Sequence, residues 1–222
     1  MLGLDTSTWR ASVGLVEDGR IVAERHDTVR SSHATTLLPL IEGTLADAGA
    51  SIDAIDAIAV SQGPGSFTGL RISMSIAKGL ALATGARLIG VATLEALALS
   101  AGVEGLICPM LDARKGEVYW AAFTVEGGKP TRLRDDALAP PLQALSELPA
   151  GCTVVGDAGE AYAGLFASLS QKSLKVLPFP EIGPRGGIVA QMGYQQLCLG
   201  QPEEDLEPRY IRASEAERNF AG

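Results

Sequence analysis

Cysteine, histidine and aromatic residues are scarce in this chain of 222 residues, and each scarcity narrows the possible functions. The three cysteines, Cys108, Cys152 and Cys198, are far apart and form no C-x-x-C pair. They predict reduced thiols in a cytosolic protein and no zinc knuckle. The two histidines, His26 and His33, cannot form a helical i, i+4 pair, and H-E-x-x-H does not occur. The histidines therefore indicate no metal site, and we interpret His33 as a helix-start or packing residue.

A basic surface and a long apolar run are also missing. The formal net charge is −8, which argues against binding a polyphosphate strand unaided. The most apolar region, 76–103, is interrupted by Lys78, Arg87 and Glu95, so no membrane span is predicted. The N-terminus has neither a basic region nor a sustained apolar run, so we expect no signal peptide. These features predict a soluble, cytoplasmic protein that does not bind membranes.

What is present is a regular alternation of strand and helix patterns in the first half. Strands are expected over 2–6, 11–17, 20–28, 55–61 and 87–91, and helices over 35–48, 67–84 and 93–101. Asp18-Gly19 predicts a tight hairpin turn between the second and third strands. Pro39 fits the first helix only if it lies in the first turn, where its missing N–H costs little. The predicted order is β-β-β-α-β-α-β-α.

The second half begins like the first. Leu4-Asp5 aligns with Leu111-Asp112, strand 12–16 with 119–123, and the Asp18-Gly19 turn with a position near 126–128. A repeat of this length predicts two related β-sheet units. The second copy then diverges into a proline-rich link (140–149), a strand (153–157), helices near 159–169 and 186–198, and an acidic, extended tail.

The segment SQGPGSFTGLRISMSIAKGLALAT (61–84) joins a glycine-rich turn to a helix, an arrangement that can bind phosphate. Its spacing does not fit a P-loop, a nucleophile elbow or a dinucleotide fingerprint. Gly63, Gly65 and Ser66 are therefore weak candidates for binding an anion. Asp5 is a further weak candidate, because it ends a strand where a sugar kinase places a carboxylate, as Asp112 does in the second half. A strand-end aspartate is also a common turn residue.

Helix 67–84 lacks the wide polar face of a surface helix, since between Leu70 and Thr84 only Arg71 and Lys78 are charged. The preceding helix is also apolar over a broad arc. Two such neighbours suggest a partner protein, with small residues allowing close helix approach. We expect Ile72, Ile76 and Leu80 to face the sheet. The predicted partner-contacting residues are Leu38, Ile41, Leu45, Leu70, Met74, Ala77 and Ala81.

Together these features resemble the two-lobed actin/hsp70/sugar-kinase superfamily and, more narrowly, the TsaB proteins, bacterial accessory subunits for threonylcarbamoyladenosine formation on tRNA. The likeness is carried by LGLDTST, His33 with LLP, SQGPGSFTGLRIS, AKGLALA, LDARKGEVY and PRYIR; Ala34 departs from the serine usual in the family. It implies a duplicated, two-lobed actin-like (RNase H-like) α/β fold, with a complete first lobe (1–103) and a degenerate second lobe (104–222).

The resemblance also implies a function. The catalytic paralogue TsaD has a metal-binding His-Leu-Glu-Gly-His run where this chain has Thr93-Leu94-Glu95-Ala96-Leu97, and neither Thr93 nor Leu97 can replace an imidazole. We expect a non-catalytic subunit without a cofactor. It would pair with a TsaD-like transferase, bind a TsaE-like ATPase and meet tRNA only within the complex. The same pairing would also allow a homodimer when the chain is alone, and the sequence leaves homodimer and monomer as alternatives. The alternative is a small nucleotide-dependent kinase or acyltransferase using Asp5 and the GPGS turn.

Overall fold

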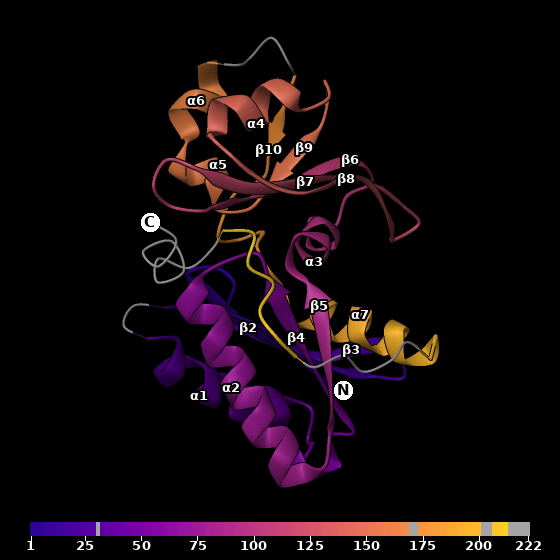
Figure 1. Cartoon of the computed structure of the whole chain (residues 1–222). Coiled ribbons are helices and arrows are strands. Elements are labelled where there is room, and N and C mark those ends of the chain that lie inside the picture. The colour runs from indigo at the N-terminus through magenta and orange to yellow at the C-terminus, as the bar shows by residue number, and fades with distance from the viewer. Residues whose placement is uncertain (30–31, 169–172, 201–205, 213–222) are drawn as a thin grey trace.

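Two β-sheets, each covered by helices, lie one above the other (Figure 1). The computed structural model describes residues 1–29, 32–168, 173–200 and 206–212. The first half contains β1 (Leu2–Asp5), β2 (Arg10–Glu17), β3 (Arg20–Thr28), α1 (His33–Asp47), β4 (Ala57–Gly63), α2 (Phe67–Thr84), β5 (Arg87–Ala92) and α3 (Thr93–Ser100), with a short 3-10 turn (Ile52–Ala54) before β4. The predicted order β-β-β-α-β-α-β-α is therefore confirmed.

The second half contains β6 (Gly105–Asp112), β7 (Val118–Glu126), β8 (Lys129–Ala139), α4 (Pro141–Glu147), β9 (Thr153–Val155), α5 (Ala158–Ala161), α6 (Ala163–Ser168), β10 (Lys175–Val176) and α7 (Gly186–Cys198).

The two sheets repeat one topology. In the first sheet the strand order is β3-β2-β1-β4-β5, and in the second it is β8-β7-β6-β9-β10. In each sheet the first three strands are antiparallel and the last two join in parallel. Asp5 pairs with Ser12, but Asp112 pairs with Val118, so the second connection is one residue shorter. The predicted duplication and the two-lobed actin-like fold are confirmed, while the predicted alignment of the second strands is off by one residue.

Helices cover both faces of the first sheet, which explains why its central strands are buried throughout. On β4, Ile58 and Val60 pack toward α1 and α2, whereas Ala57 and Ala59 pack toward α7 on the other face. We call this sheet with α1, α2 and α7 the first lobe. Strand β4 therefore has a continuous apolar sequence, as expected for a parallel strand buried on both sides.

Glycines bring α7 unusually close to the first sheet. A Cβ on Gly3 would lie under 3.0 Å from atoms of Gly186 and Ala190, and a Cβ on Gly14 would meet Gly187. The Gly186 N–H also donates to Ser12 Oγ at 2.9 Å. The predicted bounds of this helix, 186–198, are confirmed.

The second sheet, with α4, α5 and α6, forms the second lobe. On β6, Cys108 and Met110 pack toward these helices, while Ile107 and Leu111 pack toward Leu94 of α3. Helix α3 therefore lies between the two lobes and gives the second sheet its other apolar cover (Figure 1). Cys108, Cys152 and Cys198 all lie within the described residues and form no disulfide there, in agreement with the predicted reduced thiols.

Several predictions for individual elements were wrong. Pro39 lies inside α1, beyond the first turn, because the helix begins at His33 after the N-cap Ser32. The proline-rich link contains α4, since Pro141 occupies the first turn, where proline is tolerated. The helix expected near 159–169 is divided at Tyr162 into α5 and α6, and its last predicted residue, Leu169, lies outside the described residues.

The position of α7 bears on the predicted lobes. This helix comes from the second half of the sequence but packs on the first sheet, so the first lobe contains chain from both halves. The boundary between 103 and 104 stays a prediction. Of the tail predicted to be extended, 201–205 and 213–222 lie outside the described residues.

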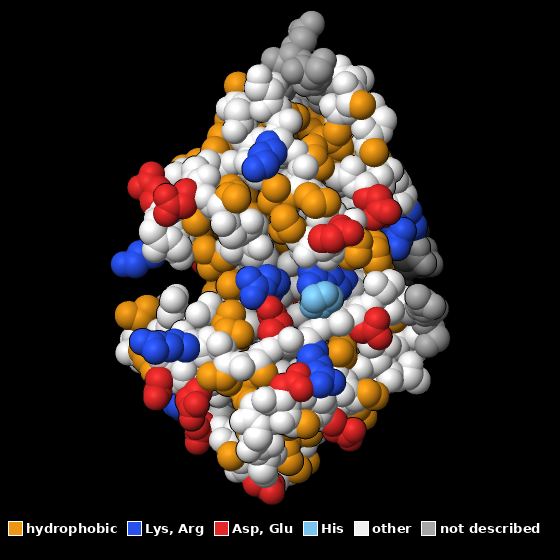
Figure 2. Space-filling view, turned by 180° about the vertical axis from the view of Figure 1, so that it is seen from behind, with side chains coloured by type: hydrophobic (Ala, Val, Ile, Leu, Met, Phe, Trp, Pro, Cys, Tyr) orange, Lys and Arg blue, Asp and Glu red, His pale blue; other side chains and the backbone are white. Residues whose placement is uncertain are grey.

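Charged side chains of both signs are mixed on the face shown in Figure 2, and basic ones gather with a histidine at mid-height. Among the described residues, this face thus shows no extended surface of one sign. Among the described helices, none is both long enough and apolar enough to cross a membrane.

Candidate functional site

A cleft of about 780 Å³ lies between the lobes. Its wall includes the end of the β1–β2 turn, the GPGS turn, the first residue of α1 and the loop after β6. The ionisable side chains that line it are His33, Arg71, Asp112, Arg114, Lys115, Asp157, Tyr119, Tyr210 and Arg212. The cleft thus brings together both halves of the sequence repeat, and its position between two lobes is one that ligand sites commonly occupy.

Asp5 does not present a free carboxylate to this cleft. It is completely buried, and its Oδ1 accepts hydrogen bonds from the backbone N–H and the hydroxyl of Ser7, at 2.9 and 2.8 Å. Its Oδ2 accepts a hydrogen bond from Ser61. Burial raises the pKa of Asp5, while the hydrogen bonds from Ser61 and Ser7 oppose that rise. The carboxyl group therefore joins the turn that follows β1 to strand β4. This is the structural role of a turn residue, which the sequence left as the alternative to anion binding.

The GPGS turn uses its polar groups in the same region. The Gly63 N–H donates to Thr93 Oγ1 at 2.9 Å, and the Ser66 N–H donates to the Ser7 carbonyl at 2.7 Å. The Ser66 hydroxyl caps α2 by accepting from the Gly69 N–H at 3.2 Å. Gly65 packs on Ser7, where a Cβ would lie 2.7 Å from the Ser7 carbonyl oxygen. The N–H groups of Gly63 and Ser66 therefore already donate hydrogen bonds to protein acceptors, and they do not point freely toward an incoming anion.

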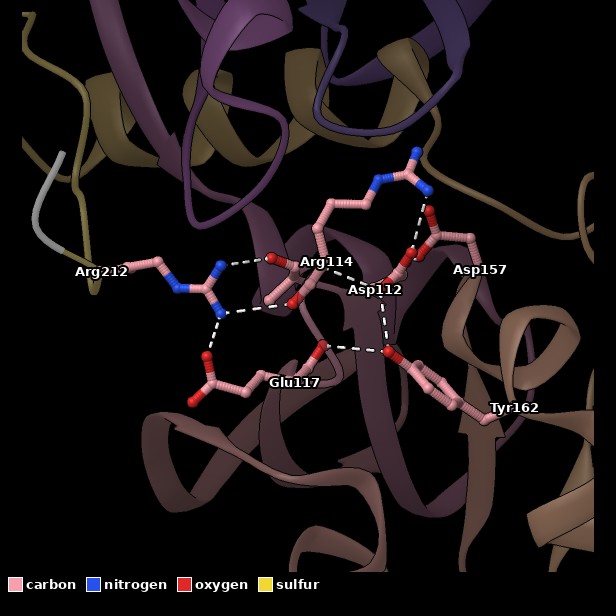
Figure 3. A network of polar contacts seen from close by, with 7 residues as sticks. Asp112, Arg114, Glu117, Asp157, Tyr162 and Arg212 are labelled. Atoms are coloured by element: carbon pink, nitrogen blue, oxygen red, sulfur yellow. Dashed lines mark hydrogen bonds and ion pairs between the residues drawn. The ribbon is translucent and has the colours of Figure 1, made fainter. Parts of the chain in front are cut away.

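The second lobe has a more open carboxylate at the position equivalent to Asp5. Asp112 Oδ1 accepts from the Arg114 N–H at 2.9 Å and from the Tyr162 hydroxyl at 3.1 Å (Figure 3). Its backbone N–H donates to Asp157 Oδ1 at 2.8 Å. Burial raises the pKa of Asp157 to about 6, against the hydrogen bond from the Asp112 N–H and with the help of the Asp112 charge. Asp157 can therefore exchange a proton near neutral pH.

The sequence did not single out Asp157. The only signal for it was its position at the end of the predicted strand 153–157, next to the better-marked strand end at Asp112.

The histidines occupy separate places. His33 is the first residue of α1, which confirms its predicted position at a helix start, and it lies in the cleft wall. Burial lowers the pKa of His33, and the charge of Asp5 opposes this shift. His26 is on β3, where burial and the charge of Arg10 lower its pKa. Within the described residues, no group of three or more His, Cys, Asp or Glu side chains is placed to hold a metal ion.

Thr93 and Leu97 both have structural contacts. Thr93 begins α3 and its hydroxyl accepts the Gly63 N–H, linking this helix to the GPGS turn. Leu97 is completely buried with Ile107 and Phe123, between α3 and the second sheet. Thr93 thus holds the GPGS turn in place, and Leu97 helps to hold the two lobes together.

Comparison with known proteins supports one family. A family model described as TsaD, tRNA N6-adenosine threonylcarbamoyltransferase, matches residues 25–220. The chain belongs to this family.

Relatives within the TsaD family carry the name TsaB. The chain is 40% identical over 126 residues to the tRNA threonylcarbamoyladenosine biosynthesis protein TsaB of Escherichia coli, a match that spans 55% of this chain and 54% of that protein. It is 27% identical to the Bacillus subtilis protein of the same name, over 99% of this chain and 97% of that one. The structure is similar to YeaZ from Pseudomonas aeruginosa, with a TM-score of 0.77 and 27% identity over 95% of this chain and 98% of that chain.

The structure corrects the orientation predicted for α1 and α2 in this TsaD-family chain. Of the residues expected to contact a partner, Ile41, Leu45, Leu70, Met74 and Ala77 are buried within the first lobe. Leu38 is 46% exposed, and Ala81 is partly buried. Ile72, Ile76 and Leu80, expected to face the sheet, are instead only partly buried.

The reason is the size of the side chains on the inner face of α2. Leu70, Ser73, Met74 and Ala77 follow one another along this face, and Ser73 and Ala77 leave room for the helix to approach the sheet. The Ser73 hydroxyl is satisfied by the Leu70 carbonyl at 3.1 Å. A comparison by hydrophobicity alone therefore selected the wrong face.

The outward surface of α1 and α2 carries several apolar side chains next to the charged side chain of Arg71. We define the outer face as Leu38, Phe67, Ile72, Ser75, Ile76 and Leu82. Phe67 is 41% exposed and Leu82 90% exposed. A groove of about 450 Å³ lined by Ala34 and the first three turns of α2 runs along it. This surface is suited to receive apolar side chains from another protein.

Residues near the C-terminus also line the cleft. The sequence predicted only an acidic, extended tail there and no site residues. Tyr210 stacks on Phe67 with ring centroids 5.0 Å apart, and Arg212 donates to the Ala113 carbonyl at 2.7 Å. Both lie in the PRYIR motif. This motif contributed to the family resemblance, but it did not show where its residues lie in the fold.

Proposed function

We propose that this chain is a non-catalytic subunit of tRNA threonylcarbamoyladenosine biosynthesis that binds a TsaD-like transferase through the outer face of α1 and α2. The names of the E. coli and B. subtilis relatives support the process, and the family model supports common descent with the transferase. The single observation that carries the interface is the pair of helices with exposed apolar side chains on a folded lobe.

A paralogous partner would have two helices equivalent to α1 and α2. Apolar faces of this kind on both proteins would pack as a four-helix arrangement with pseudo-twofold symmetry. The same geometry would let two copies of this chain pair when the partner is absent, since a twofold interface uses one surface twice. The groove is lined by Ala34 of α1 and by Ile72 and Ile76 of α2, whereas Leu82 lies near the end of α2.

The absence of catalysis in our proposal rests on Thr93 and Leu97. A histidine at position 97 would have to enter a completely buried apolar contact between α3 and the second sheet. A histidine at position 93 would remove the acceptor for the Gly63 N–H. We further propose that the transferase supplies the chemistry, that a TsaE-like ATPase joins the pair, and that tRNA is bound only within this cytoplasmic complex.

The alternative, a nucleotide-dependent kinase or acyltransferase, would use Asp5 and the GPGS turn. The buried, hydrogen-bonded carboxyl of Asp5 and the engaged N–H groups of Gly63 and Ser66 speak against it. ATP turnover by the isolated chain after stringent purification would favour this alternative over our proposal.

Two substitutions on the outer face test the interface. Ser75→Arg and Leu38→Glu each place a charge on an exposed position, so the fold should tolerate them. In a complex, an unpaired buried charge commonly costs roughly 2–5 kcal/mol. We therefore expect the Kd for the TsaD-like partner, measured by titration calorimetry, to rise by about 30-fold or more. The melting temperature should stay within about 2 °C of the parent, as for surface substitutions generally.

Leu142→Glu is the matched control, because Leu142 is 59% exposed on α4 of the second lobe, away from the outer face. It should leave the Kd unchanged. If Ser75→Arg and Leu38→Glu are folded and bind the partner as tightly as the parent does, the interface lies elsewhere. Ala77→Glu, at another predicted partner-contacting residue, would test folding instead, because Ala77 is completely buried.

A further inference from the structure

The segment 206–212 runs from the first lobe to the second, and its residues Tyr210 and Arg212 line the cleft. It starts in the first lobe, where Leu206 is 4% exposed and belongs to the core beneath α1 and α2. The Arg209 N–H then donates to the Gln62 carbonyl at 2.7 Å, at the end of β4. Gly63 permits this approach, since a Cβ there would lie 2.6 Å from the Arg209 carbonyl oxygen. The segment is therefore anchored to the same strand end that begins the GPGS turn.

Its next anchor is the first turn of α2. The Tyr210 ring stacks on Phe67, and the Tyr210 hydroxyl accepts a hydrogen bond from Arg71 Nε at 2.9 Å. The Arg71 guanidinium also lies over the Phe67 ring, 3.9 Å from its centroid. Stacking and a charged hydrogen bond both fix Tyr210 in place on the first lobe.

The other end of the segment contacts the second lobe through Arg212. Arg212 donates to the carbonyls of Ala113 and Arg114, at 2.7 and 3.4 Å, and forms an ion pair with Glu117 (Figure 3). The Arg212 side chain is only 13% exposed. Within the described residues, the first-lobe end thus has several anchors of different kinds, and the contact of the second-lobe end is that of the Arg212 guanidinium.

The turn that receives Arg212 has an uncommon conformation. Arg114, Lys115 and Gly116 have φ values of 61°, 56° and 75°, and two of these residues are not glycine. A left-handed conformation is unfavourable for each residue with a Cβ. Asp112 fixes one end of the turn by accepting the Arg114 N–H, and Arg212 binds its carbonyl groups. The turn and Arg212 therefore hold each other in place.

The lobes are joined differently on the side of α3. There Leu94 and Leu97 pack into the apolar face of the second sheet, and Glu95 forms an ion pair with Arg132 of β8 at 3.5 Å. Polar groups can exchange protein partners for water, but buried leucines have no such exchange. The side of the cleft at α3 is thus the more permanent contact, and the side at Arg212 is the one that can separate.

We propose that residues 206–212 form a strap that holds the cleft closed, with Arg212 as its releasable contact. When Arg212 leaves the 113–117 turn, the lobes separate around α3 and the cleft opens on the side of Tyr210. The strap remains on the first lobe through Leu206, Arg209 and Tyr210. This inference does not depend on the proposed function, because it concerns contacts within one chain.

Hydrogen exchange and a distance measurement on the full chain test the strap. Arg212→Ala removes the contact, and Arg25→Ala is the matched control, because the Arg25–Asp47 ion pair joins two elements of the first lobe. Nitroxide labels at Leu82→Cys on α2 and Leu142→Cys on α4 report the separation of the lobes, in a Cys198→Ser background that removes the exposed native thiol.

In the Arg212→Ala variant we expect amide exchange of Ala113, Arg114 and Glu117 to accelerate roughly tenfold or more, since hydrogen bonds from a charged group are lost. The label distances should gain a longer component that neither the parent nor Arg25→Ala has. Faster exchange with an unchanged distance distribution would overturn the proposal, because Arg212 would then hold only the turn. Unchanged exchange would also overturn it. If Arg212→Ala does not fold, Arg212→Lys is measured in the same way, since one ammonium cannot satisfy both carbonyls and Glu117 in the geometry of the guanidinium.

Discussion

The contact between α7 and the first sheet predicts a large effect from the smallest possible side chain. In Gly3→Ala the new methyl group would meet the Gly186 carbonyl, lie 2.5 Å from the Ala190 nitrogen and lie 2.8 Å from the Ala190 Cβ. Two of these are backbone atoms of a helix and cannot rotate away. Gly3 is not among the glycines with a positive φ, so alanine can adopt its backbone conformation. The free-energy cost of Gly3→Ala therefore comes from packing and not from backbone strain.

The magnitude follows from what must move. Ordinary contact requires 3.4–4 Å, so α7 has to shift outward by about 1 Å. Overpacking of this kind typically costs roughly 1–3 kcal/mol. The shift also weakens the hydrogen bond from Gly186 to Ser12, a loss of about 1 kcal/mol. We expect a total of about 3 kcal/mol, which lowers the Tm of a chain of this size by roughly 6–12 °C.

Thermal unfolding followed by circular dichroism measures this difference, with Gly79→Ala as the control. Gly79 lies in α2 with no heavy atom within 4 Å of a Cβ, so alanine should stabilise the helix by roughly 0.5–1 kcal/mol and raise the Tm. The two substitutions, chemically identical, should thus have opposite signs. A Gly3→Ala variant that melts at or above the parent temperature would refute the close seating of α7 on β1.

Two further predictions concern buried polar groups. Thr93→Val keeps the shape of the side chain but leaves the Gly63 N–H without its acceptor. The free energy of unfolding, measured with urea, should therefore fall by roughly 1–3 kcal/mol. An unchanged value would contradict the link between α3 and the GPGS turn. The pKa of Asp157 in the folded protein, about 6, lies above the ordinary value of 3.8. The contribution of its neutral form to stability is therefore complete below pH 3.8 and is lost as the pH rises through 6. Asp157→Asn stays neutral, so its free energy of unfolding should exceed that of the parent by an amount that grows from pH 4 to pH 7, up to about 3 kcal/mol; a difference that does not depend on pH would contradict this.

The sequence predicted the first lobe well because its signals are local and agree with one another. The Asp18-Gly19 turn fixes a hairpin, and Ser66 and Gly85 mark the two ends of α2 with a side-chain cap and a left-handed residue. The repeat of Leu4-Asp5 at Leu111-Asp112 predicted the second sheet, because two matching starts imply one topology.

Other features depend on contacts that no local pattern contains. The inner face of α2 is set by where small side chains meet the sheet, so Ser73 and Ala77 are buried while Ile76 is partly exposed. Pro140 and Pro141 can begin a helix or a linker, and packing of Ala144 and Leu145 against the second sheet decides for the helix. At the candidate site, Asp5 and the GPGS turn were identified, but Asp157 and Arg212 reach the cleft only through the tertiary fold.

The origin of α7 has a consequence for the synthesis of this protein. Strands β1 to β5 and helices α1 to α3 have all been made when the ribosome reaches residue 103, yet one face of the first sheet still lacks its helix. At 5–20 residues per second, roughly 5–19 s pass before Cys198 is made. During this time Ala57, Ala59, Ile89 and Val91 have no cover from Val189 and Met192. The growing chain therefore exposes a glycine-lined apolar surface to the cell, and the first lobe is completed only after the second has been translated.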